Sequence, residues 1–426
     1  MRFLAVIFLL MFMWACSPRS FILKQVTKSE KELHHHVGFA LYDPQDKKFL
    51  IQHQSDQYFT PASNTKIFTL FASLNLLGDS VTAFRYLPLG DSLIFWGMGD
   101  PSFLYKNAYQ SGKAYQFLQS FPGKLYFAAT NFYTEPLGPG WAWSDYDSYY
   151  SAERSAFPVY GNLVEVKRVG EEFSTTPAYF MEHFTVANQQ RDREEVTRGL
   201  DDNQLTYFTG KKSNSEWTIP FRSTTDVVID LLSDTLKREV LEAPILISAE
   251  AKTLKSVPVD SLYKVMMQDS DNFIAEQLLL QCAALVSDSL KPANAIKYVT
   301  EKWLADLPDK PRWVDGSGLS RFNLFTPRSI VVLWDKIYAL VPQERLFSLL
   351  AVGGQSGTIK NWYKNDTPYI FGKTGSLNNN HILSGYLRTR TGRILIFSFM
   401  NNNYLAPTNE VRKRMEEVLL TIYNKY

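Results

Sequence analysis

Three short strings decide how this chain is interpreted: Ser63-Asn64-Thr65-Lys66, Ser270-Asp271-Asn272 and Lys373-Thr374-Gly375. An S-x-x-K string arises by chance about once or twice in a chain of this length, so the first string alone carries little weight. K-T-G is rarer, and the presence of all three strings in this order is a strong signal. Together they predict an active-site serine.

The residues around the first string favour a buried helix. Thr60-Pro61 suits a helix start, because proline is tolerated in the first turn. Gly78 suits its end. Between them, apolar side chains recur at helical spacing: Ile67, Leu70, Phe71, Leu74 and Leu77. We therefore expect Ser63 to lie at the start of a helix.

A serine hydroxyl is a poor nucleophile until a neighbouring base removes its proton. Ser63 and Lys66 are three residues apart, so on a helix they share one face. Lys66 acts as a base only if its pKa falls, and burial or a second cation such as Lys373 would lower it. Free backbone N–H groups at the helix start would suit an oxyanion.

The second string supplies polar groups on a link between two predicted helices, one from Asp260 onward and one from Asn272 to Leu285. Ser270 could relay a proton to a leaving nitrogen. Asn272 could hold either Lys66 or an amide of the substrate.

The third string follows Tyr369-Ile370-Phe371 and is expected on a strand. Lys373, Thr374 and Ser376 offer a positive charge and two hydroxyls, which suits a substrate carboxylate. The strand edge at Gly375–Ser376 would pair with an extended peptide and supply a second N–H group to the oxyanion.

The chain divides into a discontinuous domain and an insertion. Its two ends predict the elements of one sheet flanked by helices: strands Val37–Tyr42, Lys48–His53, Ile382–Leu387 and Arg393–Met400, and a last helix with Val411, Met415, Val418 and Ile422. Ser63 and Ser270 are separated by far more chain than one connection needs. We predict a catalytic domain of residues 17–78 and 257–426, and an inserted domain or domains of residues 79–256.

The insertion is predicted to contain strands Ser92–Gly97, Lys124–Ala129 and Leu163–Val169. Its segment Tyr126–Tyr160 is crowded with aromatic residues, among them Trp141 and Trp143. These rings could form a platform on which sugars stack. We favour ordinary packing in a loop-rich domain.

The N-terminus predicts export. Met1-Arg2 precedes an apolar run from Phe3 to Ala15, which is too short to span a bilayer and resembles a secretory signal. Ala15-Cys16 resembles the end of a bacterial lipoprotein signal, in which the cysteine becomes the lipidated first residue. We expect residues 1–16 to be this signal, Cys16 to be the lipidation site, and the protein to lie on the periplasmic face of the outer membrane.

Composition excludes several other classes. The net charge is +2 and no dense basic stripe is present, which argues against nucleic acid as a partner. Apart from Cys16 the only cysteine is Cys282, so no intrachain disulfide is expected. None of the six histidines lies in a G-x-S-x-G or H-E-x-x-H setting, so we propose neither a Ser-His-Asp triad nor a zinc site, and no cofactor.

Longer strings around these motifs resemble one family. Phe59–Lys66, Gly99–Ser102, Asp315–Arg321 and Gly372–Ser376 are similar to the D-alanyl-D-alanine carboxypeptidase/endopeptidase family, the class C low-molecular-mass penicillin-binding proteins. The resemblance covers roughly residues 37–425. It implies an α/β (α+β) fold of the β-lactamase/transpeptidase type, with an antiparallel sheet flanked by helices and a large insertion between the first two motifs.

The resemblance also implies an activity. Ser63 would be the nucleophile and Lys66 the base, Ser270 and Asn272 would assist, and Lys373 would bind the terminal carboxylate. The substrates would be peptidoglycan peptides, cleaved at D-Ala-D-Ala or at D-Ala-diaminopimelate bonds. β-Lactam antibiotics would be covalent inhibitors.

Two alternatives remain open from the residues alone. The first is a β-lactamase or esterase on the same fold, against which the insertion and the Asp315–Arg321 string argue. The second is a penicillin-binding sensor or wall-docking protein with little turnover, against which the complete set of catalytic residue types argues.

Overall fold

A computed structural model of the chain describes residues 18–426. The predicted signal, residues 1–16, and the predicted lipidation site Cys16 lie outside the described residues. Among the helices from residue 18 onward, none combines the length and the apolar character needed to cross a membrane.

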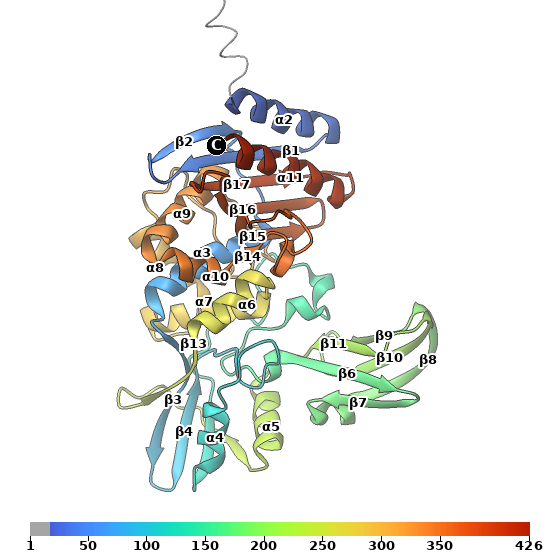
Figure 1. Cartoon of the computed structure of the whole chain (residues 1–426). Helices are drawn as coiled ribbons and strands as arrows, with labels where there is room; N and C mark the ends of the chain where they lie inside the picture. The colour runs from blue at the N-terminus through green and yellow to red at the C-terminus, as the bar shows by residue number, and fades with distance from the viewer. Residues whose placement is uncertain (1–17) are drawn as a thin grey trace, which may run out of the picture.

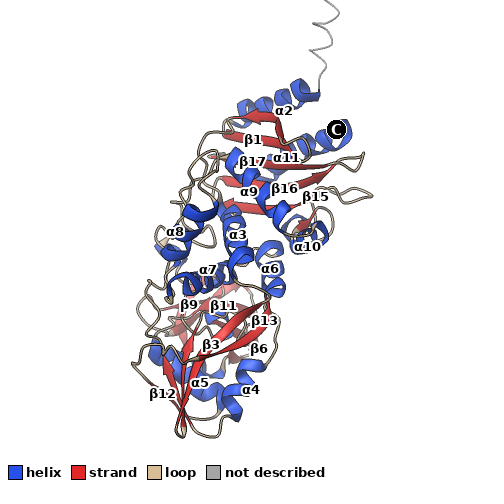
Figure 2. Ribbon diagram, turned by 90° about the vertical axis from the view of Figure 1, so that its left-hand side faces the viewer, coloured by secondary structure: helices blue, strands red, loops and turns tan. Residues whose placement is uncertain are grey.

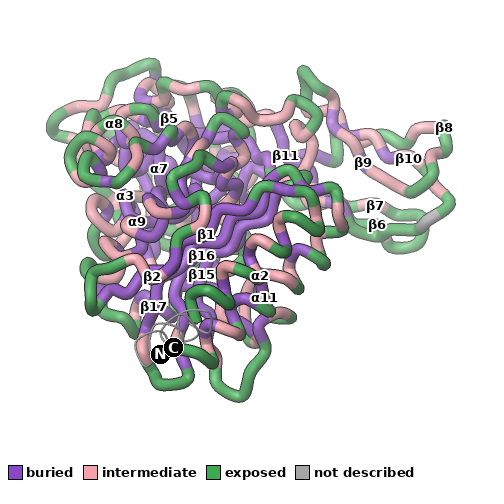
Figure 3. Tube along the Cα trace, turned by 90° about the horizontal axis from the view of Figure 1, so that it is seen from above, coloured by how far each residue is buried: buried purple, intermediate pink, exposed green. Residues whose placement is uncertain are grey.

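The main sheet is antiparallel throughout and joins the two ends of the chain. Its strands, in spatial order, are β14 (Ala351–Val352), β15 (Ile370–Leu377), β16 (Asn380–Arg388), β17 (Ile394–Asn402), β1 (His36–Asp43) and β2 (Lys48–His53). Strand β1 pairs with β17, so a strand from the start of the chain lies beside one from its end. The central strands are buried along nearly their whole length, as Figure 3 shows.

Helices cover both faces of this sheet. On one face, α2 (Pro18–Leu33) packs beside α11 (Thr408–Lys425), as Figures 1 and 2 show. Ile22 and Val26 of α2 and Val411 and Met415 of α11 are buried in one apolar cluster with the sheet. Because helices cover both faces of the sheet, both faces of β17 are buried, which explains its almost wholly apolar sequence. The predicted antiparallel sheet flanked by helices is confirmed.

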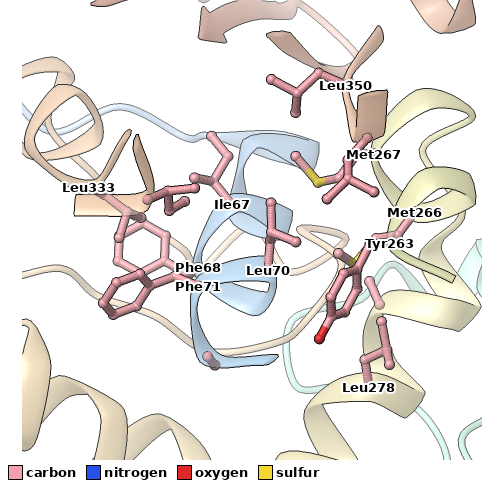
Figure 4. Packing of buried hydrophobic residues seen from close by; sticks show 14 of the residues in the cluster. Ile67, Phe68, Leu70, Phe71, Tyr263, Met266, Met267, Leu278, Leu333 and Leu350 are labelled. Atoms are coloured by element: carbon pink, nitrogen blue, oxygen red, sulfur yellow. The ribbon is translucent and has the colours of Figure 1, made fainter. Parts of the chain in front are cut away.

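The other face of the sheet packs on a core centred on one helix, α3 (Lys66–Leu76). Eight of its eleven residues are buried, which explains why its sequence is apolar nearly all round. Figure 4 shows Ile67 and Leu70 of this helix among side chains from neighbouring helices. The helices around this core are α6 (Val259–Gln268), α7 (Asn272–Ser287), α8 (Pro292–Trp303), α9 (Pro327–Leu340) and α10 (Gln343–Leu349).

Residues 80–258 contain three further sheets within the described chain. The largest contains, in order, β12 (Val240–Glu242), β5 (Lys124–Ala128), β4 (Ser92–Gly97), β3 (Ser80–Leu89) and β13 (Lys252–Pro258). The edge strand β13 pairs antiparallel with its neighbour β3, so the chain leaves the catalytic core and returns to it at adjacent strands. Helices α4 (Lys113–Ser120) and α5 (Thr225–Leu236) pack on this part.

The other two sheets form an arm that projects sideways from the body in Figure 1. One contains β11 (Glu216–Pro220), β6 (Leu163–Val169) and β7 (Glu172–Thr176); the other contains β8 (Phe184–Arg193), β10 (Leu205–Lys212) and β9 (Glu195–Arg198). The division of the chain into domains of residues 17–78 with 257–426 and of residues 79–256 stays a prediction, because the pairing of strands into sheets does not by itself define domain boundaries.

The sequence analysis missed several helices. Helix α2 is one of them, although Ile22, Val26 and Ser29 recur along its buried face. Helix α9 is another, and Thr326 caps it by accepting a hydrogen bond from the backbone N–H of Ser329. A Thr-Pro pair at its start was an available signal for this helix.

Candidate active site

Ser63 lies on a short 3-10 turn, η1 (Ala62–Thr65), that leads directly into α3. The predicted helix start is therefore a tighter turn, with the α-helix itself beginning at Lys66. The side chain of Asn64 joins this turn to the sheet: its Nδ2 donates to the backbone oxygen of Lys373 (2.9 Å) and its Oδ1 accepts from Ser384 Oγ (2.6 Å). The first and third motifs are thus held together by a buried residue inside the first.

Two glycines allow the backbone to approach this turn. A Cβ on Gly375 would lie 2.5 Å from the backbone oxygen of Pro61 and 3.1 Å from the backbone nitrogen of Ser63. A Cβ on Gly318 would lie 1.9 Å from the backbone oxygen of Ala62, and Gly318 has a φ of +89°. Only glycine fits at either position without displacing the turn that carries Ser63.

The amine of Lys66 is completely buried and has three polar neighbours. Its Nζ is 3.0 Å from Ser63 Oγ, and it donates to Asn272 Oδ1 (2.6 Å) and to the backbone oxygen of Ser317 (2.7 Å). The last two atoms only accept hydrogen bonds. A neutral lysine has two hydrogens, which these acceptors use, so its lone pair is left facing the Ser63 hydroxyl.

The second motif fixes the start of α7. Asp271 caps this helix by accepting from the backbone N–H of Ile274 (2.9 Å), and its other oxygen accepts from Tyr105 OH (2.6 Å). Asn272 uses its amide nitrogen to donate to the backbone oxygen of Tyr150 (2.9 Å). Of the two roles predicted for Asn272, the structure places its side chain on Lys66, with both polar atoms engaged.

The third motif lies on β15, as predicted, and Lys373 is as fully buried as Lys66. Lys373 Nζ donates to Ser270 Oγ (2.8 Å) and to the backbone oxygen of Thr374 (2.9 Å). Ser270 has a φ of +65°, which a residue other than glycine rarely adopts. The strained backbone turns the Ser270 side chain to the lysine.

Burial lowers the pKa of both lysines. For Lys66 desolvation is the main cause, nearby Asp315, Asp271 and Glu276 oppose it, and the pKa falls to about 8. For Lys373 desolvation again dominates, the neighbouring charge of Lys66 adds to it, and the pKa falls well below its usual value. The two amines therefore share one electrostatic environment in which a neutral lysine is accessible near neutral pH.

These residues line the base of an open cleft of about 870 Å³. Ser63, Ser270, Asn272 and Ser376 face the cleft. The amines of Lys66 and Lys373 and the Thr374 hydroxyl lie behind its surface, where Thr374 Oγ1 is 2.6 Å from Thr358 Oγ1. The structure thus brings together all the residues predicted from the three motifs: Ser63, Lys66, Ser270, Asn272, Lys373, Thr374, Gly375 and Ser376.

Sequence analysis did not identify two groups that position the Lys66 amine, the Ser317 backbone oxygen and the Glu276 side chain. The Ser317 backbone oxygen has no sequence signature, although the Asp315–Arg321 string contains it. Glu276, one helical turn after Asn272, accepts from the backbone N–H of Ser317 (2.7 Å) and is buried. A glutamate on the buried face of an apolar helix was the available signal.

Some aromatic residues of the insertion pack against other parts of the protein, and others are exposed. Trp141 Nε1 donates to Asp315 Oδ2 (2.9 Å), and Tyr146 OH donates to the backbone oxygen of Arg198 (3.0 Å). Trp143 is 78% exposed. Ordinary packing accounts for Trp141 and Tyr146 and not for Trp143.

Comparison with known proteins identifies the family. The model of the D-Ala-D-Ala carboxypeptidase 3 (S13) family matches residues 22–422, nearly the whole described chain. The chain belongs to this family. This protein is a serine-type D-Ala-D-Ala carboxypeptidase acting on peptidoglycan.

Individual S13 relatives are distant in sequence. The chain is 24% identical to the D-alanyl-D-alanine carboxypeptidase DacB of Haemophilus influenzae, over 86% of this chain and 85% of that protein. It is 23% identical to the penicillin-sensitive carboxypeptidase A of Dictyostelium discoideum, over 90% of this chain and 85% of that protein.

The fold is shared with a solved S13 structure. Penicillin-binding protein 4 (dacB) of Haemophilus influenzae superposes with a TM-score of 0.77 and 20% identity, covering 94% of this chain and 99% of that one. The same protein in complex with a β-lactam superposes with a TM-score of 0.69, at 20% identity and the same coverage. The predicted β-lactamase/transpeptidase-like fold is confirmed at this level.

The lowered pKa of Lys66 predicts the pH dependence of this S13 enzyme. Lys66 accepts a proton only when neutral, so the rate of Ser63 acylation should rise with pH through about 8. Lys66→Arg should reduce kcat/KM by about 100-fold or more, because arginine stays protonated. Release of D-alanine from a D-Ala-D-Ala peptide between pH 5 and 10 measures both effects. A rate that falls over this range, or an active Lys66→Arg variant, would reject Lys66 as the base.

Proposed function

We propose that the S13 activity proceeds through an acyl-enzyme on Ser63. The single observation that carries this proposal is the contact of Ser63 Oγ with a buried amine whose other two neighbours are obligatory acceptors. Ser63 attacks the carbonyl carbon of the penultimate D-alanine, and its proton passes to Lys66. The backbone N–H groups of Ser63 and Ser376 stabilise the oxyanion, since Gly375 brings β15 against the Ser63 turn.

The leaving D-alanine is handled by the groups around Lys373. The Ser270 hydroxyl faces the cleft and gives its proton to the leaving nitrogen as the C–N bond breaks; a proton held by the paired lysines restores the hydroxyl. Ser376 donates to the terminal carboxylate, and Lys373 and Thr374 act on it from behind the cleft surface. Water then attacks the ester, with Lys66 accepting its proton, and Ser63 is regenerated.

The cleft also suits a substrate that carries both charges beyond the scissile bond. Asp145 and Asp269 line it together with Arg321 and Lys106. Diaminopimelate presents an amine and a carboxylate, so it finds partners of both signs here. We therefore extend the proposal to endopeptidase cleavage of D-Ala-diaminopimelate cross-links.

β-Lactams are proposed to acylate the same serine. Their amide is cyclic, so the leaving nitrogen stays tethered to the acyl group and shields the ester from water. A natural peptide releases its D-alanine, which opens that space. The H. influenzae relative is described in a complex with a β-lactam, and the Dictyostelium relative is named penicillin-sensitive.

Ser63→Ala tests the nucleophile directly. The variant should lose D-alanine release and covalent labelling by a fluorescent penicillin, because Ser63 Oγ is the cleft hydroxyl beside the proposed base Lys66 (3.0 Å), whereas Ser270 Oγ lies beside Lys373 and accepts a hydrogen bond from it. Gel fluorescence after a penicillin pulse measures the labelling. Thr358→Ala, which changes a hydroxyl behind the cleft, is the matched control and should still label. Labelling of the Ser63→Ala protein would overturn the assignment.

The persistence of the penicillin adduct distinguishes a peptidase from a β-lactamase. Intact-mass spectrometry after a penicillin pulse should show one added drug mass that lasts far longer than one peptide turnover. The reason is that the tethered leaving group blocks the approach of water to the ester. Rapid return to the unmodified mass, with hydrolysed drug accumulating, would favour the β-lactamase alternative.

We also propose that the enzyme is an exported lipoprotein, from the signal-like residues 1–16 and the cysteine that follows Ala15. Ser17 is not the aspartate that commonly retains lipoproteins at the inner membrane, which favours the outer membrane. Cys16→Ala should move the protein from the membrane pellet to the soluble fraction. Native protein that is already soluble would mean that the signal is simply removed.

A further inference from the structure

Two buried carboxylates lie beneath the base of the active site and have no part in the mechanism derived above. Asp315 is 0% exposed and Glu276 is 0% exposed. Buried carboxylates are costly unless hydrogen bonds and cations offset them. Their partners therefore show what these residues hold in place.

Asp315 acts on the peptide unit to which Lys66 donates. Its Oδ1 accepts from the backbone N–H of Gly318 (2.9 Å), and the carbonyl of that same peptide unit belongs to Ser317 and accepts from Lys66 Nζ (2.7 Å). A carboxylate on the N–H end polarises the carbonyl end and strengthens its pull on the amine. The orientation of the Ser317 carbonyl therefore fixes the direction in which the Lys66 amine donates a hydrogen bond, and with it the direction of the amine's lone pair.

Glu276 fixes the adjoining peptide unit. Its Oε1 accepts from the backbone N–H of Ser317 (2.7 Å), so the two carboxylates hold Ser317 from both of its peptide bonds. Its Oε2 is 3.4 Å from Arg154 NH1 in an ion pair of which both side chains are buried. Burial and the nearby Asp315 raise the pKa of Glu276 to about 7, and the charge of Arg154 opposes that rise.

Both carboxylates are secured by the inserted part of the chain. Trp141 Nε1 donates to Asp315 Oδ2 (2.9 Å). Arg154, beside the ring of Trp141, is itself held by the backbone oxygens of Glu135 (2.9 Å) and Leu137 (3.0 Å). A single segment, residues 135–154, thus reaches under the catalytic lysine and contacts both acids.

We propose that Trp141 and Arg154 are positioning residues for the base Lys66, acting through Asp315 and Glu276 on the two peptide units of Ser317. This proposal rests on the proposed role of Lys66. It makes the inserted segment part of the catalytic machinery of the S13 domain, in addition to its contribution to the cleft wall. Neither residue touches Ser63 or the substrate side of the cleft, so each acts only through other groups.

The charges that face Lys66 set the direction of each expected effect. They are Asp271 and Glu276 on α7, Lys373 on β15, Asp315 on the loop before Gly318, and Arg154 from the insertion behind Glu276. The three acids raise the pKa of Lys66, and burial lowers it. A change in one of these charges therefore moves the pH at which the base becomes active.

Trp141→Phe is the first test, because it keeps an aromatic ring beside Arg154 while removing the indole N–H together with the second ring of the indole. Without this hydrogen bond the negative charge of Asp315 acts more strongly on Lys66, so the pKa of Lys66 should rise. The acid limb of the pH–rate profile, which is the pH range where the acylation rate rises, should therefore move to higher pH. The rate constant for labelling by fluorescent penicillin at neutral pH should fall by about ten-fold, the usual effect of losing a hydrogen bond to a charged group. Trp143→Phe, two residues along and 78% exposed, is the matched control and should leave both quantities unchanged.

Glu276→Gln is the second test and should act in the opposite direction. The amide oxygen still accepts from the Ser317 N–H, so the acceptor stays in place while one negative charge is lost. The acid limb should move to lower pH. Because this variant is isosteric, it supplies a result even where Trp141→Phe lowers the yield of folded protein, which circular dichroism and the melting temperature monitor.

The outcomes separate this proposal from the proposed function. Opposite shifts of the pH limb in the two variants support it. A folded Trp141→Phe protein with a wild-type rate and limb, or one whose rate falls equally at every pH, overturns it, and so does an unshifted limb in Glu276→Gln. An active Lys66→Arg variant would instead show that the proposed base is wrong, independently of Trp141.

Discussion

The site depends on one constraint, a lysine amine removed completely from water. A buried ammonium is expensive, so the amine must be surrounded by groups that satisfy its hydrogens without fully stabilising its charge. Asn272 and Ser317 provide two neutral acceptors, while the acids stay one peptide unit or more away. The fold brings the first motif, the start of α7, β15 and the loop around Ser317 to one point, and the pKa of Lys66 is the quantity that their arrangement controls.

Residues with a local signature could be predicted, and groups without one could not. Ser63 and Lys66 stand out because their spacing gives them one face of a turn, and Lys373 because it follows apolar residues within a predicted strand. The carbonyls of Ser317 and Tyr150 belong to the backbone, which every residue carries. Their role emerges only when segments distant in sequence meet, and the same applies to the pairing of Glu276 with an arginine from the insertion.

The fold divides in a similar way. Alternating or continuous apolar runs predicted the strands of the main sheet. Short turns between antiparallel neighbours such as β16 and β17 also made their pairing predictable. The insertion was located by its length, yet its arrangement was not, since β4 and β12 both pair parallel with β5 across long connections. Helix α2 was not predicted from the sequence because its buried face is narrow and most of its remaining residues are polar.

The pairing of β1 with β17 has a consequence for how the molecule is made. During synthesis β1 leaves the ribosome long before β17, the neighbour that completes it on one side. Until β17 emerges, the apolar strand β1 has one open edge. Closure of the sheet is therefore a late event, and the open edge of β1 is a site for aggregation until β17 is in place.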